Sequence, residues 1–179
     1  MKSSRKVLFT FDYELFLGKK SGTAYECMID PTNRLLEIFR ELHVGAIFFV
    51  DTTYLIRLQE FSKSNIECRN DFNTVAAQLK HLVRQGHYVY PHIHPHWLDA
   101  VYIPEINQWD LSNVSRYRFH NLSESDRDYV FNGSIDILNQ ILLPEFPDYK
   151  IDGFRAGGWS LQPFSDFKPY FEKHQIKYD

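Results

Sequence analysis

The stretch Tyr90-Pro91-His92-Ile93-His94-Pro95-His96-Trp97 places three histidines at alternate positions beside two prolines. In an extended backbone, side chains at alternate positions point to the same side, so the three imidazoles would converge. Imidazole nitrogen is a common ligand of zinc and similar divalent metals. The pattern therefore predicts a metal site here, in preference to a surface turn with incidental histidines.

The segments on either side of this stretch predict strands that alternate with helices. Glycine, proline and capping residues separate the apolar runs, and the spacing of apolar residues distinguishes helices from strands. Residues 52–61 are mixed, with a helix as one interpretation, and residues 100–121 are expected to form an irregular loop over the site. The expected strands are 5–12, 46–50, 87–90, 151–155 and 176–178, and the expected helices are 31–44, 71–85 (capped by Asn70 or Asp71), 124–143 (capped by Ser123) and 163–175.

This alternation predicts a single α/β domain over residues 1–179 with parallel strands and right-handed crossovers. The first strand is nearly all apolar and is expected to be buried on both faces. Asp12, Asp51, His92, His96 and Arg155 all follow the ends of predicted strands. That edge of the sheet is where α/β barrels and open α/β sheets build their sites. For Asp51, capping the following helix is the favoured interpretation.

Composition narrows the class of protein further. The chain has 179 residues, 44% hydrophobic content and a formal net charge of −3, so no basic field favours nucleic acid. No apolar run is long enough to span a bilayer. The run Val7–Phe11 is too short for the core of a signal peptide, which predicts a cytoplasmic protein. Cys27 and Cys68 are then expected to be reduced, and no pattern specifies an oligomeric state.

Asp12, Glu14, the histidines and Arg155 together predict hydrolytic chemistry. A divalent metal held by histidines and a carboxylate activates water, and a neighbouring carboxylate accepts its proton. An arginine beside that carboxylate keeps it ionised and oriented. Each residue also has a simpler explanation: Asp12 as a helix cap, Glu14 as a solvated loop residue, and Arg155 as a structural ion-pair partner.

Three motifs in order resemble the polysaccharide deacetylases, the family 4 carbohydrate esterases with the NodB homology domain. The motifs are Thr10-Phe11-Asp12-Tyr13-Glu14, then Gly86-His87 leading to His92-x-x-x-His96, then Gly153-Phe154-Arg155-Ala156-Gly157-Gly158-Trp159. The segment from Ala46 to Thr52 also looks like part of this family. The resemblance implies a distorted (β/α) barrel of about seven strands.

The resemblance also implies roles for individual residues. Asp12 matches the family's general base, Arg155 matches the arginine that pairs with it, and His92 and His96 match the two metal-binding histidines. The family's reaction is metal-dependent removal of acetyl groups from polymeric sugars.

Several residues depart from the family pattern. Tyr13 stands where the family has a metal-binding aspartate, and Glu14 is the expected substitute ligand. His94 has no counterpart and is open to three roles: third ligand, support for a ligand, or wall of the site. We assign His94, Trp97, Trp159 and Tyr13 to substrate binding. The family's later motifs, including the histidine that acts as general acid, are not found, so we expect the barrel to be incomplete.

The sequence thus predicts a metal-dependent hydrolase that deacetylates an acetylated amino sugar or glycan, with zinc favoured over nickel or cobalt. Two alternatives stay open. One is a related hydrolase of a non-sugar amide, suggested by Tyr13. The other is a degenerate module that binds sugar without catalysis, suggested by the missing general acid.

Overall fold

A curled parallel sheet forms the centre of the computed structural model, which describes residues 6–159 and 161–179. Within these residues the sheet has four strands in the order β1-β2-β3-β6, so the predicted parallel α/β arrangement is confirmed. It is consistent with part of an α/β barrel, but the described chain does not form a barrel of about seven strands. The strands are β1 (Phe9–Tyr13), β2 (Ala46–Asp51), β3 (Tyr88–Ile93) and β6 (Arg155–Ala156).

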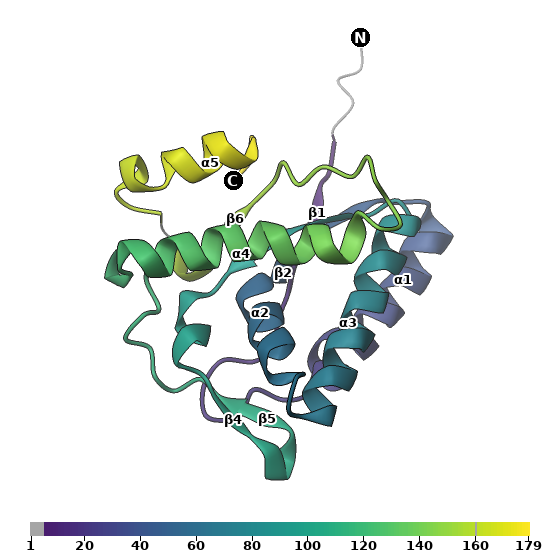
Figure 1. Ribbon diagram of the computed structural model, residues 1–179. Coiled ribbons are helices and arrows are strands. Elements are labelled where there is room, and N and C mark those ends of the chain that lie inside the picture. The colour runs from purple at the N-terminus through teal and green to yellow at the C-terminus, as the bar shows by residue number, and fades with distance from the viewer. Residues whose placement is uncertain (1–5, 160) are drawn as a thin grey trace.

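Helices connect the strands, as the alternating pattern predicts. α2, α3 and α4 all contact β3 and lie together on one side of the sheet (Figure 1). Their apolar residues supply much of the core against that face. The helices are α1 (Asp30–Leu42), α2 (Thr52–Phe61), α3 (Ile66–Arg84), α4 (Glu124–Leu142) and α5 (Lys168–His174).

Side-chain caps explain where three of these helices begin. Asp51 accepts a hydrogen bond from the backbone N–H of Tyr54, which confirms it as the cap of α2, and Ser123 caps α4 in the same way. The predicted start of α3 at Asn70 or Asp71 is wrong. α3 begins five residues earlier because Asn65 accepts a hydrogen bond from the N–H of Cys68.

The first and last strands differ from their predictions. β1 is an edge strand rather than one buried on both faces, and Phe9 is 41% exposed. The predicted strand 151–155 is reduced to β6 plus one bridge between Gly153 and Tyr178, and that bridge is all that forms of the predicted strand 176–178.

The predicted irregular loop contains a small hairpin. β4 (Val101–Ile103) and β5 (Gln108–Asp110) pair antiparallel through a turn in which Asn107 has a positive φ of 49°. Asn tolerates this left-handed conformation better than most residues do. The segment that follows the hairpin brings Tyr117 close to the end of β3, with its ring centroid 6.2 Å from that of His94.

An apolar cavity of about 800 Å³ lies on one face of the sheet. Phe49 of β2, Tyr90 of β3 and the side chain of Arg155 are among the residues that line it. No helix in the described part of the chain is long and apolar enough to cross a membrane.

Candidate metal centre

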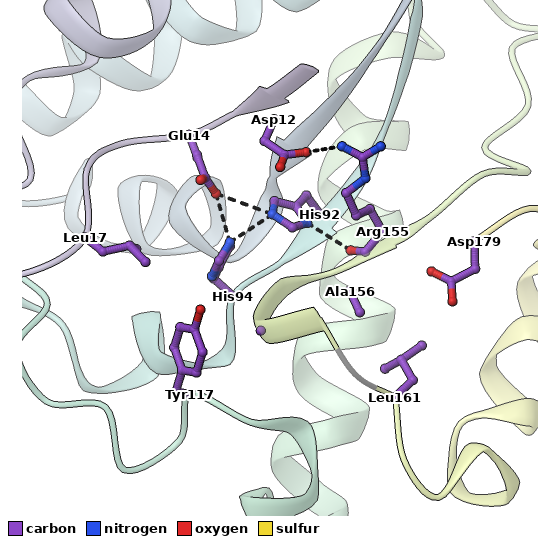
Figure 2. Close-up of a pocket in the computed structure, with 11 residues that line it drawn as sticks. Asp12, Glu14, Leu17, His92, His94, Tyr117, Arg155, Ala156, Leu161 and Asp179 are labelled. Atoms are coloured by element: carbon purple, nitrogen blue, oxygen red, sulfur yellow. Dashed lines mark hydrogen bonds and ion pairs between the residues drawn. The ribbon is translucent and has the colours of Figure 1, made fainter. Parts of the chain in front are cut away.

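Three side chains converge at the carboxyl ends of β1 and β3. The Nε2 atom of His94 lies 2.8 Å from Oε2 of Glu14 and 2.9 Å from Nε2 of His92, and the Glu14–His92 distance is 3.4 Å. These atoms all lie within 4.8 Å of one another, so Glu14, His92 and His94 could hold a metal ion (Figure 2). We refer to them as the Glu–His–His group.

The sheet register brings these residues together. β1 and β3 both flank β2 in parallel, so their carboxyl ends lie at the same edge. Glu14 directly follows β1, His92 lies near the end of β3, and His94 directly follows β3. The extended backbone therefore places His92 and His94 on the same side, as alternation predicts.

His96 does not join this group, although the sequence predicts it as a ligand. Pro95 begins a short 3-10 helix, η2 (Pro95–Asp99), directly after His94. The alternating geometry ends there, so the third imidazole takes a different direction. The structure brings together Glu14, His92 and His94, and so favours the ligand role for His94 over the wall of the site.

The donor set fits a divalent metal ion. Tetrahedral zinc with bonds of about 2.0–2.2 Å separates neighbouring ligand atoms by about 3.3–3.6 Å. The Glu14–His92 distance of 3.4 Å already matches this spacing, and the distances of 2.8 and 2.9 Å would lengthen on metal binding. Nδ1 of His92 lies 3.0 Å from the carbonyl oxygen of Arg155. When that nitrogen donates its proton to the carbonyl, Nε2 keeps a free lone pair for a metal, the usual support for a metal-binding histidine. Oε2 of Glu14 is buried, and the Nε2 atoms of His94 and His92 are its neighbours, at 2.8 and 3.4 Å.

Charge and burial have opposite effects on the pKa values of Glu14 and His94. Burial raises the pKa of Glu14, but hydrogen bonds and charge from His92 and His94 outweigh it, and the pKa falls to about 2. Burial likewise lowers the pKa of His94, but Glu14 and Asp51 outweigh it and raise the pKa above its usual value. Glu14 is therefore ionised at neutral pH, as a carboxylate ligand must be.

Two further buried groups surround the centre. Burial, assisted by charge on His94, lowers the pKa of His96 to about 4, so its imidazole is neutral near pH 7. Burial raises the pKa of Asp51 to about 6. Asp51 also accepts a hydrogen bond from the indole of Trp97, so it fixes the structure behind the centre.

Asp12 and Arg155 lie together beside the group, as the sequence predicts. The guanidinium of Arg155 donates to the carboxylate of Asp12 and, at 3.0 Å, to the hydroxyl of Thr10. It also stacks on the ring of Phe49, 3.9 Å from the ring centroid. These contacts hold the Asp12 carboxylate at the end of β1, facing the same space as Glu14 (Figure 2).

That space is a cavity of about 430 Å³ at the carboxyl edge of the sheet. Its walls combine acidic, imidazole, guanidinium, phenol and aliphatic groups, which suits a ligand with both polar and apolar faces. The lining residues are Asp12, Glu14, Leu17, His92, His94, Tyr117, Arg155, Ala156, Gly158, Leu161 and Asp179.

Two residues predicted to bind substrate lie elsewhere. Tyr13 is 3% exposed, and its hydroxyl donates to Gln78 of α3 at 2.6 Å, on the opposite side of β1 from Glu14. Trp97 is fully buried and packs in the core against Tyr54. The side chain of Trp159, the third such residue, lies outside the described residues.

Tyr117 and Leu17 line the cavity but are absent from the sequence-based site. Both come from irregular segments where neither periodicity nor a motif marks a functional residue. The only sequence signal for Tyr117 is its place in the aromatic segment 100–121, which was expected to cover the site.

Comparison of the chain with protein-family models, curated proteins and solved structures gives no match.

Proposed function

We propose that this protein is a divalent-metal-dependent hydrolase that removes an acetyl group from an acetylated amino sugar or glycan. The observation that carries the proposal is the convergence of Glu14, His92 and His94 beside the Asp12–Arg155 pair in one cavity. The motif resemblance supports the choice of substrate.

The Glu–His–His group would hold the metal, with zinc favoured. A divalent cation there would supply the Lewis acidity that polarises a carbonyl oxygen and makes water a stronger acid. The carboxylate of Glu14 would partly neutralise the cation, and the carbonyl of Arg155 would keep the Nε2 atom of His92 available to it.

Asp12 would act as the base. Its carboxylate accepts a proton from the attacking water, whose oxygen bonds to the acetyl carbon. The bond from that carbon to the sugar nitrogen or oxygen then breaks, and the proton passes to the leaving group. The products are acetate and the free amine or alcohol. Arg155 pairs with Asp12 and fixes the direction of its carboxylate.

The amide alternative rests on Tyr13 replacing a metal-binding aspartate. Because Glu14 offers a carboxylate in its place and Tyr13 is buried against α3, this departure is less reason to expect metal-free chemistry.

Zinc titration calorimetry tests the metal centre. We expect Glu14→Gln and His94→Ala to weaken zinc binding by about 100-fold, consistent with loss of a ligand, and His96→Ala to change it by less than about threefold. A wild-type protein that binds no zinc, nickel or cobalt would contradict the proposal. Equal losses in His94→Ala and His96→Ala would show that the ligand set is different.

Acetate release from acetylated chito-oligosaccharides tests the reaction. Asp12→Asn should abolish release while zinc binding persists, because the amide cannot accept the proton. Turnover of a cyclic amide without any acetate release would favour the alternative function.

A further inference from the structure

Tyr117 faces the metal centre from across the cavity. Its ring centroid lies 6.2 Å from that of His94 and 5.3 Å from that of His96. The side chain is half-buried, lines the cavity and directs its hydroxyl toward His94 and Glu14 (Figure 2).

The Tyr117 hydroxyl has no hydrogen-bond partner among the described residues. Most half-buried or buried tyrosines of the chain differ in this respect: the hydroxyls of Tyr13, Tyr90 and Tyr149 are bound to Gln78, Asp152 and the carbonyl of Val89. A phenol that enters an apolar interior usually finds a partner there. The Tyr117 hydroxyl instead projects into the space where a substrate would lie.

The segment that carries Tyr117 is held in place on both sides. Arg116 forms an ion pair with Asp99 at 2.7 Å and a second one with Asp126 at 3.3 Å. Asp99 ends η2, the short helix that contains His96, so the pair links the segment to the histidine stretch. On the other side Phe119 is fully buried in the core.

The glycine turn after β6 leaves room for the ring. Gly158 has a positive φ of 70°, and a Cβ atom there would lie 3.1 Å from Cε1 of Tyr117. A side chain at this position would press on the ring and strain the backbone. The close approach of Gly158 and the ion pairs of Arg116 together hold the ring of Tyr117 beside the Glu–His–His group.

From this arrangement we infer that Tyr117 contacts the substrate and donates a hydrogen bond from its hydroxyl to the oxygen of the acyl group. The inference rests on the proposed function and assigns its site a further residue. A phenol hydroxyl donates without adding charge to a site that contains Arg155 and would hold a cation. Hydrogen bonds of this kind strengthen as negative charge develops on the oxygen, so they favour the transition state.

Binding of acetate, the proposed product, tests this contact without turnover. We expect Tyr117→Phe to weaken acetate binding to the zinc-loaded protein by about tenfold, because one hydrogen bond to a charged group is lost while the ring stays. Zinc affinity of the metal-free protein should change by less than about twofold, because the phenol is not a member of the Glu–His–His group. Tyr25→Phe is the matched control, since Tyr25 is 63% exposed and does not line the cavity.

The outcomes separate the two proposals. A wild-type protein that binds no zinc, nickel or cobalt contradicts the proposed function and, with it, this inference. Zinc binding with equal acetate affinity in wild type and Tyr117→Phe overturns this inference alone. A tenfold or greater loss of zinc affinity in Tyr117→Phe also overturns it, because the phenol would then act on the metal.

Kinetics give an independent test. Tyr117→Phe should lower kcat for acetate release more than it raises KM, because the lost bond is strongest in the transition state. An effect confined to KM would reduce Tyr117 to a wall of the cavity and contradict the donor role.

Discussion

Pro95 separates the histidines that face the cavity from the one that does not. His92 and His94 follow the alternation of an extended strand, and their predicted convergence agrees with the structure. His96 lies beyond the start of η2, and its burial lowers its pKa to about 4. A proline at the first position of a helical turn was visible in the sequence, but spacing alone does not predict where a strand ends.

Asp12 and Arg155 were also identifiable from the sequence because they lie at the ends of predicted strands. Glu14 was identifiable because it directly follows Tyr13, which stands where the resembled family has a metal-binding aspartate. Tyr117 was not, because its position depends on the ion pairs of its neighbour Arg116 and on the shape of an irregular segment. Tyr13 and Trp97 were misassigned for a related reason. Their neighbours belong to the site, but the alternation of β1 and the turn at η2 direct these two side chains into the core.

His87 provides a pH-dependent test of stability at the opposite end of β3. Its Nδ1 atom accepts a hydrogen bond from the N–H of Ala46 at 3.1 Å, so this nitrogen must be unprotonated. Burial, with a smaller effect of charge on His81, lowers its pKa below 6.5, while the rings of Phe39 and Phe48 pack against it. The unfolded chain therefore takes up this proton at a higher pH than the folded chain does.

By linkage, folding then loses stability as the pH falls through 6.5. We expect the free energy of unfolding of the metal-free protein, measured in urea, to decrease between pH 7.5 and 5. His87→Leu should be less stable at pH 7.5 by about 1–3 kcal/mol, because Ala46 loses its acceptor, and should lose less further stability on acidification. An unchanged pH slope in His87→Leu would contradict the assignment.

At the scale of elements, the metal centre depends on how closely the turn after β6 approaches the end of β3. A Cβ atom at Gly157 would lie 2.3 Å from the carbonyl oxygen of Ile93 and 2.9 Å from Cγ of His94. Nothing larger than glycine fits without moving one of these backbones. The Gly157-Gly158 pair is therefore part of the support for His94.

Gly157→Ala should lower the stability by about 1–3 kcal/mol through overpacking and weaken zinc binding by about tenfold or more through displacement of His94. Chemical unfolding and zinc calorimetry measure the two effects. Gly45→Ala is the control, because a Cβ atom there makes only an ordinary contact of 3.6 Å with the backbone. Wild-type zinc affinity in Gly157→Ala would show that the turn does not fix His94.

Helix and strand types were largely predictable, but their limits were less so. The apolar periodicity of α1 and α4 and the buried run of β2 were clear in the sequence. The start of α3 was missed because Asn65 precedes a first turn that mixes polar and apolar residues, while Asn70 and Asp71 offered equally good caps before a clearly periodic segment. The β4–β5 hairpin was missed because its strands are only three residues each, too short for alternation to be recognised.

At the scale of the whole molecule, the strands of the sheet differ in pairing, burial and length. β2 pairs on both sides and is almost entirely buried. Within the described residues, β1 pairs with β2 alone, and β6 has two residues. The alternation of strands and helices predicted the parallel order. The number of strands was not predictable from it, because strand closure depends on pairings between segments far apart in sequence.

The differences in pairing and burial between the strands predict the pattern of hydrogen exchange. We expect the slowest backbone amides in β2 and β3, where opening requires loss of the packed core, and faster exchange in β1 and β6. Exchange measured by NMR or mass spectrometry checks this. Equal protection in β1 and β2 would show that further contacts cover the exposed edge.

Arg155 lines two of the cavities described above, the polar one at the metal centre and the larger apolar one against the sheet. Its guanidinium contacts both the carboxylate of Asp12, which lines the polar cavity, and the ring of Phe49, which lines the apolar cavity. Shortening this side chain would join the two cavities and admit solvent beneath the base. The side chain of Arg155 therefore both pairs with Asp12 and separates the two cavities.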